Sequence, residues 1–380
     1  MTEPRSRKKI LHIISSASVG GAESCYLEMV SGCMRLGYDV FAACMPGGDL
    51  VEMTRKLFGD NHGGKVFEIA MRDNADVLAL WRLYKLIREL KPDLCHLHMN
   101  RATLLGALAA RFCGAASIGT IQGEVRPIYA LFPDYLTFCS KNVADFVRSR
   151  SKLVAAKSAF FLYNKIDTRK FLELSSGGGR AFLKSEFGIP EDCFVVCEVA
   201  RLHPNKGQRF FIDAVAANIS NIPNIFGIVV GGGDNPDYLD GLKNQAEKSG
   251  VSSRIIFTGT RHDVPKILKG TDLFVLPSLQ EGIPVTIMES LALGLPVLAF
   301  DVGGISELCR THDGYENFIE FAAPEDAISL NEKLGKIFMS YNTYKKEAEK
   351  AAFHIKSNFD AGSYIRDVDA IYRHIFSGRA

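Results

Sequence analysis

Two glutamates, Glu281 and Glu289, flank a segment whose residue types suit a phosphorylated ligand. An apolar run before Glu281 predicts a strand, and Pro284 predicts the start of a helix to about Leu293, because proline fits the first helical turn. The unpaired amides at a helix start favour an anion such as a diphosphate. Gly282 permits a close backbone approach. Ionised carboxylates accept hydrogen bonds from the hydroxyls of a sugar or ribose.

A second polar segment, at residues 198–207, reads Glu-Val-Ala-Arg-Leu-His-Pro-Asn-Lys-Gly. Arg201 follows a predicted strand and Lys206 precedes a predicted helix, so both are expected at the carboxyl edge of a parallel sheet. A cationic pair there can neutralise a leaving diphosphate. A lone Arg or Lys in such a loop is usually solvated, and each glutamate alone fits a surface position. The combination of all four indicates a binding site.

The elements that must position these residues alternate along the whole chain. Short β-rich apolar runs are separated by longer amphipathic stretches, which is typical of parallel α/β architecture. Predicted helices include 22–36 and 76–90. The predicted strands are 9–15, 39–44, 65–69, 93–97, 117–121, 135–139 and 159–163 in the first half, and 193–200, 225–230, 254–258, 273–276 and 296–300 in the second.

A length of 380 residues is enough for two domains, each with its own core. A polar stretch that ends in Ser-Ser-Gly-Gly-Gly separates the two halves. We therefore expect a first domain at 1–165, a linker at 166–180, a second domain at 181–358 and a C-terminal helix at 359–380. Open α/β sheets bind ligands at the carboxyl ends of their strands, so the site is expected in a cleft between the domains.

The motifs together resemble those of retaining glycosyltransferase family 4. Glu281 and Glu289 match its E-x7-E pair in the variant Glu-Gly-Ile-Pro, and 198–207 matches its Arg and Lys segment. Residues 231–234, 257–261 and 301–304 also match. The similarity covers most of 195–310 and, more loosely, the whole chain. It implies the GT-B fold, in which two Rossmann-like, doubly wound domains face each other and a C-terminal helix packs back toward the first.

The resemblance implies a role for each matching residue. Arg201 and Lys206 would hold the diphosphate of a nucleotide-sugar donor, Glu281 the transferred sugar and Glu289 the ribose. Arg201, Lys206 and Glu281 would be the catalytic residues. The leaving diphosphate would take the acceptor proton, so neither a metal nor another cofactor is expected. The residues expected to bind the donor are Gly21, Arg201, Lys206, Arg261, Glu281, Gly282, Ile283, Pro284, Val285 and Glu289.

The first half contains three residues expected to contact the acceptor or the sugar, Gly20, His98 and Gln122. Gly20 and Gly21 resemble the family's early glycine loop, although a tight turn alone explains them equally well. His96 and His98 alternate on a predicted strand, so both face one side and are expected to be structural or substrate-contacting. Gln122 stands where many relatives have histidine; it can donate and accept hydrogen bonds but cannot act as an acid or base near neutral pH.

Composition and charge restrict the remaining possibilities. The chain is 47% hydrophobic and 23% charged, as in soluble globular proteins. Nine widely spaced cysteines without a C-x-x-C pair favour reduced thiols, a cytoplasmic protein and no structural zinc. Residues 1–170 hold 24 basic against 16 acidic residues, which suits an anionic membrane surface or ordinary solvated surface. The stretches 81–91 and 101–113 would suit a lipid-linked acceptor, and no nucleic-acid partner is expected.

The expected function is transfer of a sugar, by a hexosyltransferase-like reaction, from a nucleotide-diphosphate sugar to a glycan or lipid-linked acceptor in bacterial polysaccharide or lipopolysaccharide biosynthesis. Two alternatives stay open: a sugar-nucleotide epimerase on the same fold, and a non-catalytic nucleotide-sugar-binding protein. A pyridine-nucleotide dehydrogenase is disfavoured, because Pro236 stands where G-x-G-x-x-G needs its third glycine. No residue identifies the donor base, the sugar or the acceptor.

Overall fold

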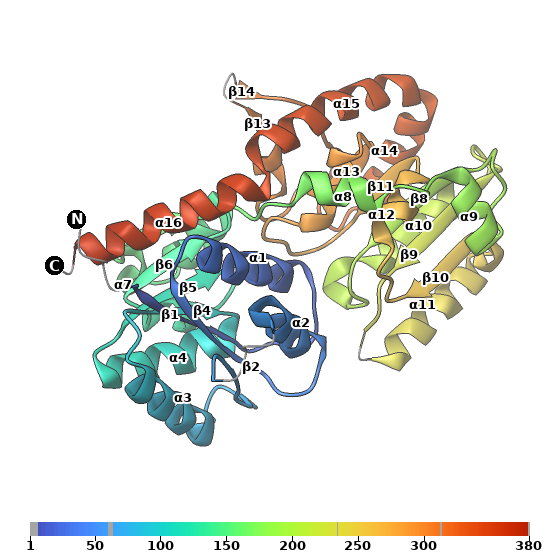
Figure 1. Ribbon diagram of the computed structural model, residues 1–380. Helices are drawn as coiled ribbons and strands as arrows, with labels where there is room; N and C mark the ends of the chain where they lie inside the picture. Colours follow the sequence, from blue (N-terminus) through green and yellow to red (C-terminus); the bar gives the residue numbers. More distant parts are fainter. Residues whose placement is uncertain (1–6, 60–63, 234, 312–313, 379–380) are drawn as a thin grey trace. The chain divides into compact units, whose positions relative to one another are not determined.

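The computed structural model describes residues 7–59, 64–233, 235–311 and 314–378. The chain divides into two compact units (Figure 1). Unit 1 comprises Met1–Asn164 and Ala361–Ala380, and unit 2 comprises Lys165–Asp360. Each unit is built around its own parallel sheet, which confirms the predicted α/β architecture.

Unit 1 contains a seven-stranded sheet with the order β3-β2-β1-β4-β5-β6-β7, in which every neighbouring pair is parallel. The strand order reverses between β1 and β4, as in doubly wound folds. The strands are β1 Lys9–Ile14, β2 Asp39–Cys44, β3 Val66–Glu68, β4 Leu94–His98, β5 Ala116–Ile121, β6 Tyr135–Phe138 and β7 Ala159–Phe161. The helices are α1 Gly21–Arg35, α2 Asp49–Phe58, α3 Val77–Leu90, α4 Asn100–Cys113, α5 Ile128–Leu131, α6 Lys141–Ser149, α7 Lys152–Ala155 and α16 Ala361–Ser377.

Apolar residues cover both faces of this sheet, because successive side chains of a strand point to opposite faces. Ile10 and Ile14 of β1 belong to a core shared with α1 and α16. Leu11 and Ile13 belong to a second core shared with α3 and α4. The near-continuous apolar runs of the strands therefore reflect helices packed on both faces.

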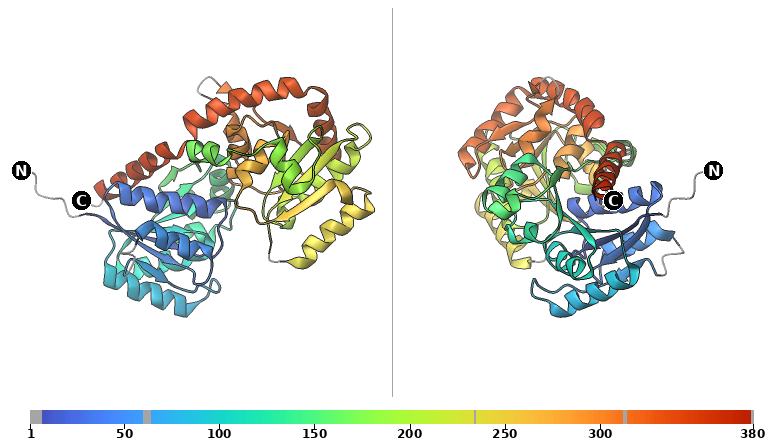
Figure 2. Two further views of the ribbon diagram at one scale, coloured as in Figure 1. Left: turned by 45° about the vertical axis from the view of Figure 1, so that its right-hand side comes forward. Right: turned by 90° about the vertical axis from the view of Figure 1, so that its left-hand side faces the viewer.

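The C-terminal helix α16 packs against α1 within unit 1, as predicted, and Figure 2 shows the two helices side by side in both views. Gly32 of α1 makes this close approach possible, since an added Cβ would lie 2.0 Å from Cδ1 of Ile365. Tyr38 donates a hydrogen bond of 2.6 Å from its hydroxyl to Asp369. The Asp369 carboxylate therefore helps to hold α16 in unit 1.

Unit 2 contains a six-stranded sheet with the order β10-β9-β8-β11-β12-β15, again with parallel neighbours and a reversal, here between β8 and β11. The strands are β8 Phe194–Val199, β9 Ile225–Val230, β10 Ile255–Gly259, β11 Leu273–Leu276, β12 Val297–Phe300 and β15 Glu320–Ala322. A hairpin pairs β13 Arg310–Thr311 with β14 Gly314–Tyr315. The helices are α8 Thr168–Leu174, α9 Arg180–Phe187, α10 Gln208–Asn218, α11 Pro236–Lys248, α12 Val264–Lys269, α13 Val285–Ala292, α14 Ala327–Met339 and α15 Tyr341–Asn358.

The structure differs from the sequence prediction at the linker and at one edge strand. Residues 166–180 were predicted to connect the domains, but they belong to unit 2 and contain α8. Asp167 caps this helix by accepting a hydrogen bond from the Lys170 amide, which explains why a polar stretch folds as a helix. The sixth strand of this sheet, β15, was not predicted from the sequence.

Candidate active site

The predicted donor-binding residues of unit 2 gather where its strand order reverses. The loop after β8 carries Arg201 and Lys206, and the loop after the adjacent strand β11 carries Glu281. The loops that follow two strands on either side of a reversal diverge to opposite faces of the sheet and leave room for a ligand between them. The sheet topology therefore brings together residues that lie 75 positions apart in the sequence.

Lys206 and Glu281 form the central contact of this site. The Lys206 ammonium donates a hydrogen bond of 2.6 Å to Oε1 of Glu281, and the exposed fractions of the two side chains are 24% and 9%. Lys206 ends the short 3₁₀ helix η2, Pro204–Lys206, which directly precedes α10. The pair is thus partly screened from solvent, where a charge-assisted hydrogen bond is stronger than at an open surface.

Backbone contacts fix the loops that carry this pair. The Leu279 amide donates to the Asn205 carbonyl over 2.8 Å, which joins the loop after β11 to the loop after β8. Gly207 has φ +76°, and an added Cβ would lie 1.8 Å from the Pro277 carbonyl oxygen. Gly303 has φ +57°, and its Cβ would lie 1.9 Å from the Glu281 carbonyl oxygen. Only glycine allows these approaches without strain.

The helix that follows Glu281 begins one residue later than predicted. Pro284 has an extended conformation with ψ 121° and is the N-cap, so α13 starts at Val285. The N-cap residue Pro284 makes no side-chain hydrogen bond to this helix start, so the first helical amides, those of Val285 and Thr286, lack the usual N-cap acceptor. Gly282 and Ile283 are buried just before the cap, and the Gly304 amide donates to the Gly282 carbonyl over 2.8 Å. The helix start keeps the polarity that attracts an anion.

The other predicted donor-binding residues of unit 2 differ in solvent exposure and in whether ion pairs hold their side chains. Arg201 is exposed. Glu289 lies on α13, and burial raises its pKa to about 8. Arg261 is held in ion pairs with Asp263, at 2.7 Å, and with Glu186, at 2.8 Å. Its predicted contact with the donor would require these structural pairs to open, and stays a prediction.

Two buried polar side chains beside this site were not singled out from the sequence. Glu198, on β8, is fully buried, and neither of its carboxylate oxygens has a hydrogen-bond partner among the described residues. Ser278, in the loop after β11, is also fully buried with an unpartnered hydroxyl. The only signal for Glu198 in the sequence is that a charged residue stands inside an apolar strand. The strand prediction did not assign it a role.

The site residues predicted in unit 1 lie around the reversal of its own sheet. Gly20 caps α1 after β1, and its amide donates to Oε2 of Glu23 over 3.0 Å. Gly21 begins α1 and is exposed. His98 ends β4, and Gln122 follows β5 and is half-buried. These loops occupy the carboxyl edge of the sheet, where such folds bind ligands.

His98 belongs to a buried cluster with His12 and His96. Nδ1 of His12 lies 3.1 Å from Nε2 of His98, and His96 contacts the hydroxyls of Tyr372 at 2.5 Å and Thr120 at 2.6 Å. The three rings stack with interplanar angles of 19° to 22°. A metal binds in the plane of each imidazole, so stacked rings suit it poorly. His98 is thus accounted for as a core residue, and its contact with the sugar stays a prediction.

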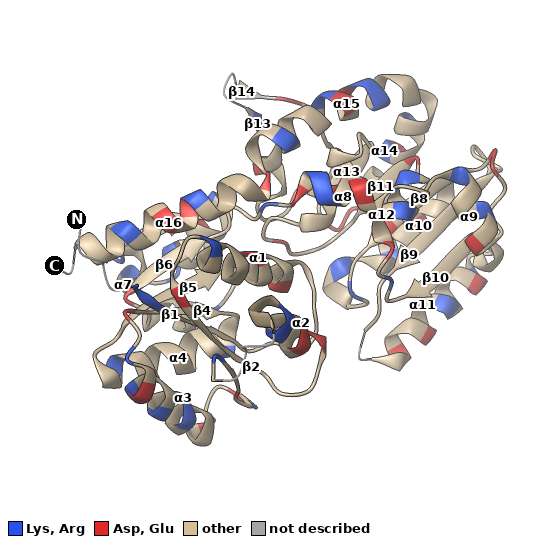
Figure 3. Cartoon of the chain, viewed as in Figure 1, with Lys and Arg blue, Asp and Glu red and all other residues tan. Residues whose placement is uncertain are grey.

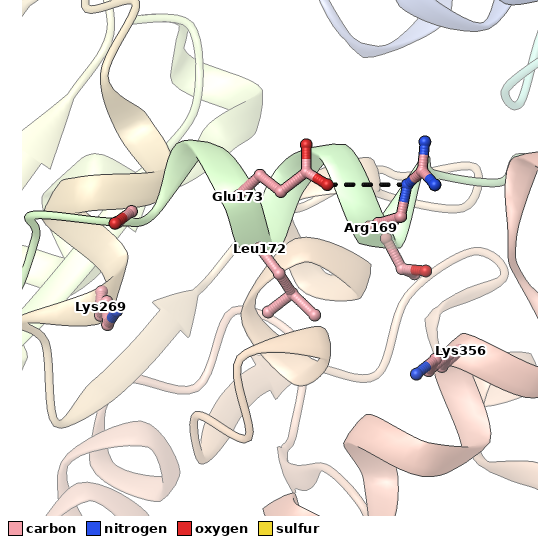
Figure 4. A pocket seen from close by; sticks show the side chains of 7 residues that line it. Arg169, Leu172, Glu173, Lys269 and Lys356 are labelled. Carbon is pink, nitrogen blue, oxygen red and sulfur yellow. Dashed lines mark ion pairs between the residues drawn. The ribbon is translucent and has the colours of Figure 1, made fainter.

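A cavity of about 710 Å³ lies elsewhere in unit 2, and Figure 4 shows it. Arg169 and Glu173 pair along α8 over 3.7 Å, and Lys269 and Lys356 come from α12 and α15. The lining residues are Thr168, Arg169, Leu172, Glu173, Ser176, Lys269 and Lys356. None of the predicted site residues lines it.

Two family models match the chain, one in each half. "Glycosyltransferase Family 4" matches residues 19–170, and "Glycosyl transferases group 1" matches residues 179–353. Together they cover both predicted domains and most of the candidate site residues.

Individual proteins are similar over different lengths. An Escherichia coli enzyme, UDP-Gal:alpha-D-GlcNAc-diphosphoundecaprenol alpha-1,3-galactosyltransferase, is 26% identical over 74% of this chain and 76% of its own length. The lipopolysaccharide core biosynthesis mannosyltransferase LpsB of Rhizobium meliloti is 34% identical over 38% of this chain and 40% of its own. Anabaena HepE, solved with UDP-glucose, has a TM-score of 0.81 at 20% identity and covers 96% of this chain and 99% of its own, which shows a shared fold.

Proposed function

We propose that this chain, which belongs to glycosyltransferase family 4, transfers a sugar from a nucleoside-diphosphate donor to a hydroxyl group of a glycan or lipid-linked acceptor. The observation that carries the proposal is the Lys206–Glu281 pair at the strand-order reversal, next to the uncapped start of α13. Cation, carboxylate and free helix amides are the groups that a sugar diphosphate requires.

The proposed reaction uses these residues in separate roles. Arg201, Lys206 and the first amides of α13 bind the diphosphate and stabilise the charge that develops as the sugar–phosphate bond breaks. Glu281 accepts hydrogen bonds from the sugar, and Glu289 from the ribose. The acceptor hydroxyl enters on the face that the diphosphate leaves and gives its proton to a phosphate oxygen, so the anomeric configuration is retained. In this proposal the cationic side chains and helix amides stabilise the leaving diphosphate, and no metal ion is needed.

The relatives support a role in polysaccharide or lipopolysaccharide biosynthesis. The E. coli relative is named for a UDP-galactose donor and a diphosphoundecaprenol-linked acceptor, and the R. meliloti relative for mannosyl transfer in lipopolysaccharide core biosynthesis. We propose an acceptor of the same class for this chain, a growing glycan on a lipid or polysaccharide.

A transfer assay tests the proposed function. Full-length protein is incubated with UDP-galactose, UDP-glucose, UDP-N-acetylglucosamine or GDP-mannose, with and without a lipid-diphosphate-linked N-acetylglucosamine or a lipopolysaccharide core acceptor. Release of nucleoside diphosphate that depends on acceptor, with an α-linked product from an α-linked donor, is the expected result. Interconversion of the sugar without acceptor would instead identify an epimerase, and binding without turnover a non-catalytic protein.

We further propose that α3 of unit 1 contacts an anionic membrane, where a lipid-linked acceptor resides. Val77 is 75% exposed, and Leu78 and Trp81 are each 50% exposed. Lys85 lies over the Trp81 ring, with Nζ 3.8 Å from its centroid. Figure 3 shows Lys and Arg along the same helix. An exposed aromatic and aliphatic face with adjacent cations is typical of interfacial helices.

Helix α4, also considered from the sequence, is largely buried, which leaves α3 as the candidate surface. Among the described residues, no helix is both long and apolar enough to cross a bilayer. Phosphatidylglycerol vesicles at low salt are expected to pellet the protein and shift Trp81 emission to the blue, whereas phosphatidylcholine vesicles do neither. Trp81→Ala should weaken pelleting, and Phe353→Ala, a change at a 75% exposed residue of unit 2, should not. Equal pelleting of both variants would contradict this surface.

A further inference from the structure

Glu198 is a buried carboxyl group on β8, the strand whose following loop carries Arg201 and Lys206. It lies next to the end of β8, on the same strand face as Phe194 and Val196, which pack into the core shared with α10. Both of its oxygens lack a hydrogen-bond partner among the described residues. A buried polar group without a partner is destabilising, so its presence calls for a functional explanation.

The charged groups that act on Glu198 are Lys206 and Glu281, the two members of the central ion pair. Burial raises the pKa of Glu198 well above its usual range, because an ionised carboxylate is poorly solvated there. The attraction of Lys206 opposes this effect, and the repulsion of Glu281 adds to it. This shift favours the neutral carboxyl, whose carbonyl oxygen can accept a hydrogen bond.

Neighbouring polar groups are already satisfied by one another. Tyr238 donates from its hydroxyl to Oε1 of Gln208 over 3.1 Å, and the Gln208 amide donates to the Arg201 carbonyl over 3.0 Å. These contacts fix the start of α10 and the loop that carries Arg201. Among the described residues beside this site, Glu198 and the Ser278 hydroxyl stay without a partner, and of the two only Glu198 carries a carboxyl group.

Under the proposed roles, binding of a donor draws Lys206 away from Glu281. The two side chains are in direct contact at 2.6 Å, but the proposed roles place Lys206 on the diphosphate and Glu281 on the sugar. An ammonium has three N–H donors, so it can bind phosphate oxygens and keep one donor for a protein acceptor. A long flexible side chain held from its buried side loses less conformational freedom when the ligand binds.

We propose that Glu198 is a positioning residue that accepts a hydrogen bond from the Lys206 ammonium once a donor diphosphate has separated Lys206 from Glu281, an inference that rests on the function proposed above. Glu198 touches neither sugar nor phosphate in this arrangement. It acts through Lys206 and sets where the ammonium lies under the diphosphate.

Titration calorimetry with UDP and with GDP on the full-length protein tests the proposal through two variants. Glu198→Leu removes the acceptor and is expected to weaken the binding of the nucleotide that the wild type prefers by about tenfold or more, the scale of one hydrogen bond to a charged group. Glu198→Gln keeps a carbonyl acceptor and is expected to bind within about twofold of the wild type. In a Lys206→Ala background, Glu198→Leu should cause no further loss, because the two residues act together.

Thermal unfolding separates this role from a structural one. Replacing an unpartnered buried carboxyl with leucine is expected to leave the unfolding temperature unchanged or raise it, so binding is lost without loss of stability. Wild-type affinity in Glu198→Leu, or a loss in Glu198→Gln as large as in Glu198→Leu, would overturn the inference. A wild-type protein that binds neither nucleotide would overturn the proposed function itself, and the inference with it.

Discussion

The Lys206 ammonium lies 2.6 Å from Oε1 of Glu281, although the two residues follow strands on opposite sides of the reversal in strand order. The site therefore pairs its own cation with its own carboxylate. This pairing neutralises two partly buried charges that would otherwise be costly. The proposed donor would offer its diphosphate to Lys206 and its sugar hydroxyls to Glu281 in place of this contact.

Lys206→Ala should lower kcat/KM for the donor by about 10²- to 10³-fold, the usual cost of removing one group that stabilises transition-state charge. Lys184→Ala is the matched control, because Lys184 forms an exposed ion pair with Glu191, at 3.1 Å, in the same unit. Steady-state kinetics and circular dichroism should show a folded, nearly inactive first variant and an active second one. Near-normal turnover of Lys206→Ala would remove this residue from the mechanism.

Gly207→Ala should impair donor binding, because the new Cβ would meet the Pro277 carbonyl oxygen at 1.8 Å and force the loop after β8 to move. Gly250→Ala is the control: Gly250 has a similar φ of +72°, but nothing lies within 4 Å of its added Cβ. In both variants an alanine must adopt a left-handed backbone conformation, which costs about 1–2 kcal/mol. Calorimetry with a nucleoside diphosphate should therefore show a loss of affinity for the first variant alone, and equal affinities would contradict the packing argument.

Glu289 should make the protein less stable as pH rises. Its pKa is about 8 in the folded state against an ordinary value of 4.5, so between these values the unfolded chain releases a proton that the folded chain retains. The free energy of unfolding should fall between pH 4.5 and 8 with a slope of at most about 1.4 kcal/mol per pH unit from this residue. Urea unfolding of the wild type and of Glu289→Gln should diverge across this window. Parallel pH profiles would show that Glu289 is not desolvated.

The histidine cluster should make unit 1 less stable as pH falls. Burial lowers the pKa of His12 to about 3, so below its ordinary value of 6.5 the unfolded chain gains a proton that the folded chain does not. His12 removes at most about 1.4 kcal/mol per pH unit as pH decreases from 6.5 to 3. Trp81, the one tryptophan of the chain, lies in unit 1 and reports its urea midpoint by fluorescence. His12→Leu should reduce the shift in midpoint between pH 7 and 5, and an unchanged shift would count against the cluster.

Much of the fold could be predicted from the sequence, because buried parallel strands and amphipathic helices leave strong periodic patterns. The helix at the C-terminus was predicted from apolar residues such as Tyr364 and Ile371, which the structure buries in unit 1. The supposed linker was wrong because Asp167 caps a helix within a polar stretch. A cap depends on one side-chain contact that composition does not show.

The site was predicted in part. The resemblance supplied Lys206 and Glu281, and the strand order explains why they meet. The sequence could not show that Arg261 is held by Glu186, since Glu186 lies on α9 and Arg261 in the loop after β10. Glu198 could not be predicted as a site residue, because its burial, and not its residue type, makes its carboxyl unusual.

The packing of α16 onto α1 has a consequence for how the chain acquires its structure during synthesis. Asp369 is made 331 residues after Tyr38, to which it is bonded, whereas unit 2 is one continuous segment. All of unit 2 is therefore synthesised before α16 can cover the sheet face around Ile10 and Ile14 in unit 1. Unit 2 is expected to fold first, and the nascent first unit to expose an apolar surface that chaperones bind until the last helix emerges.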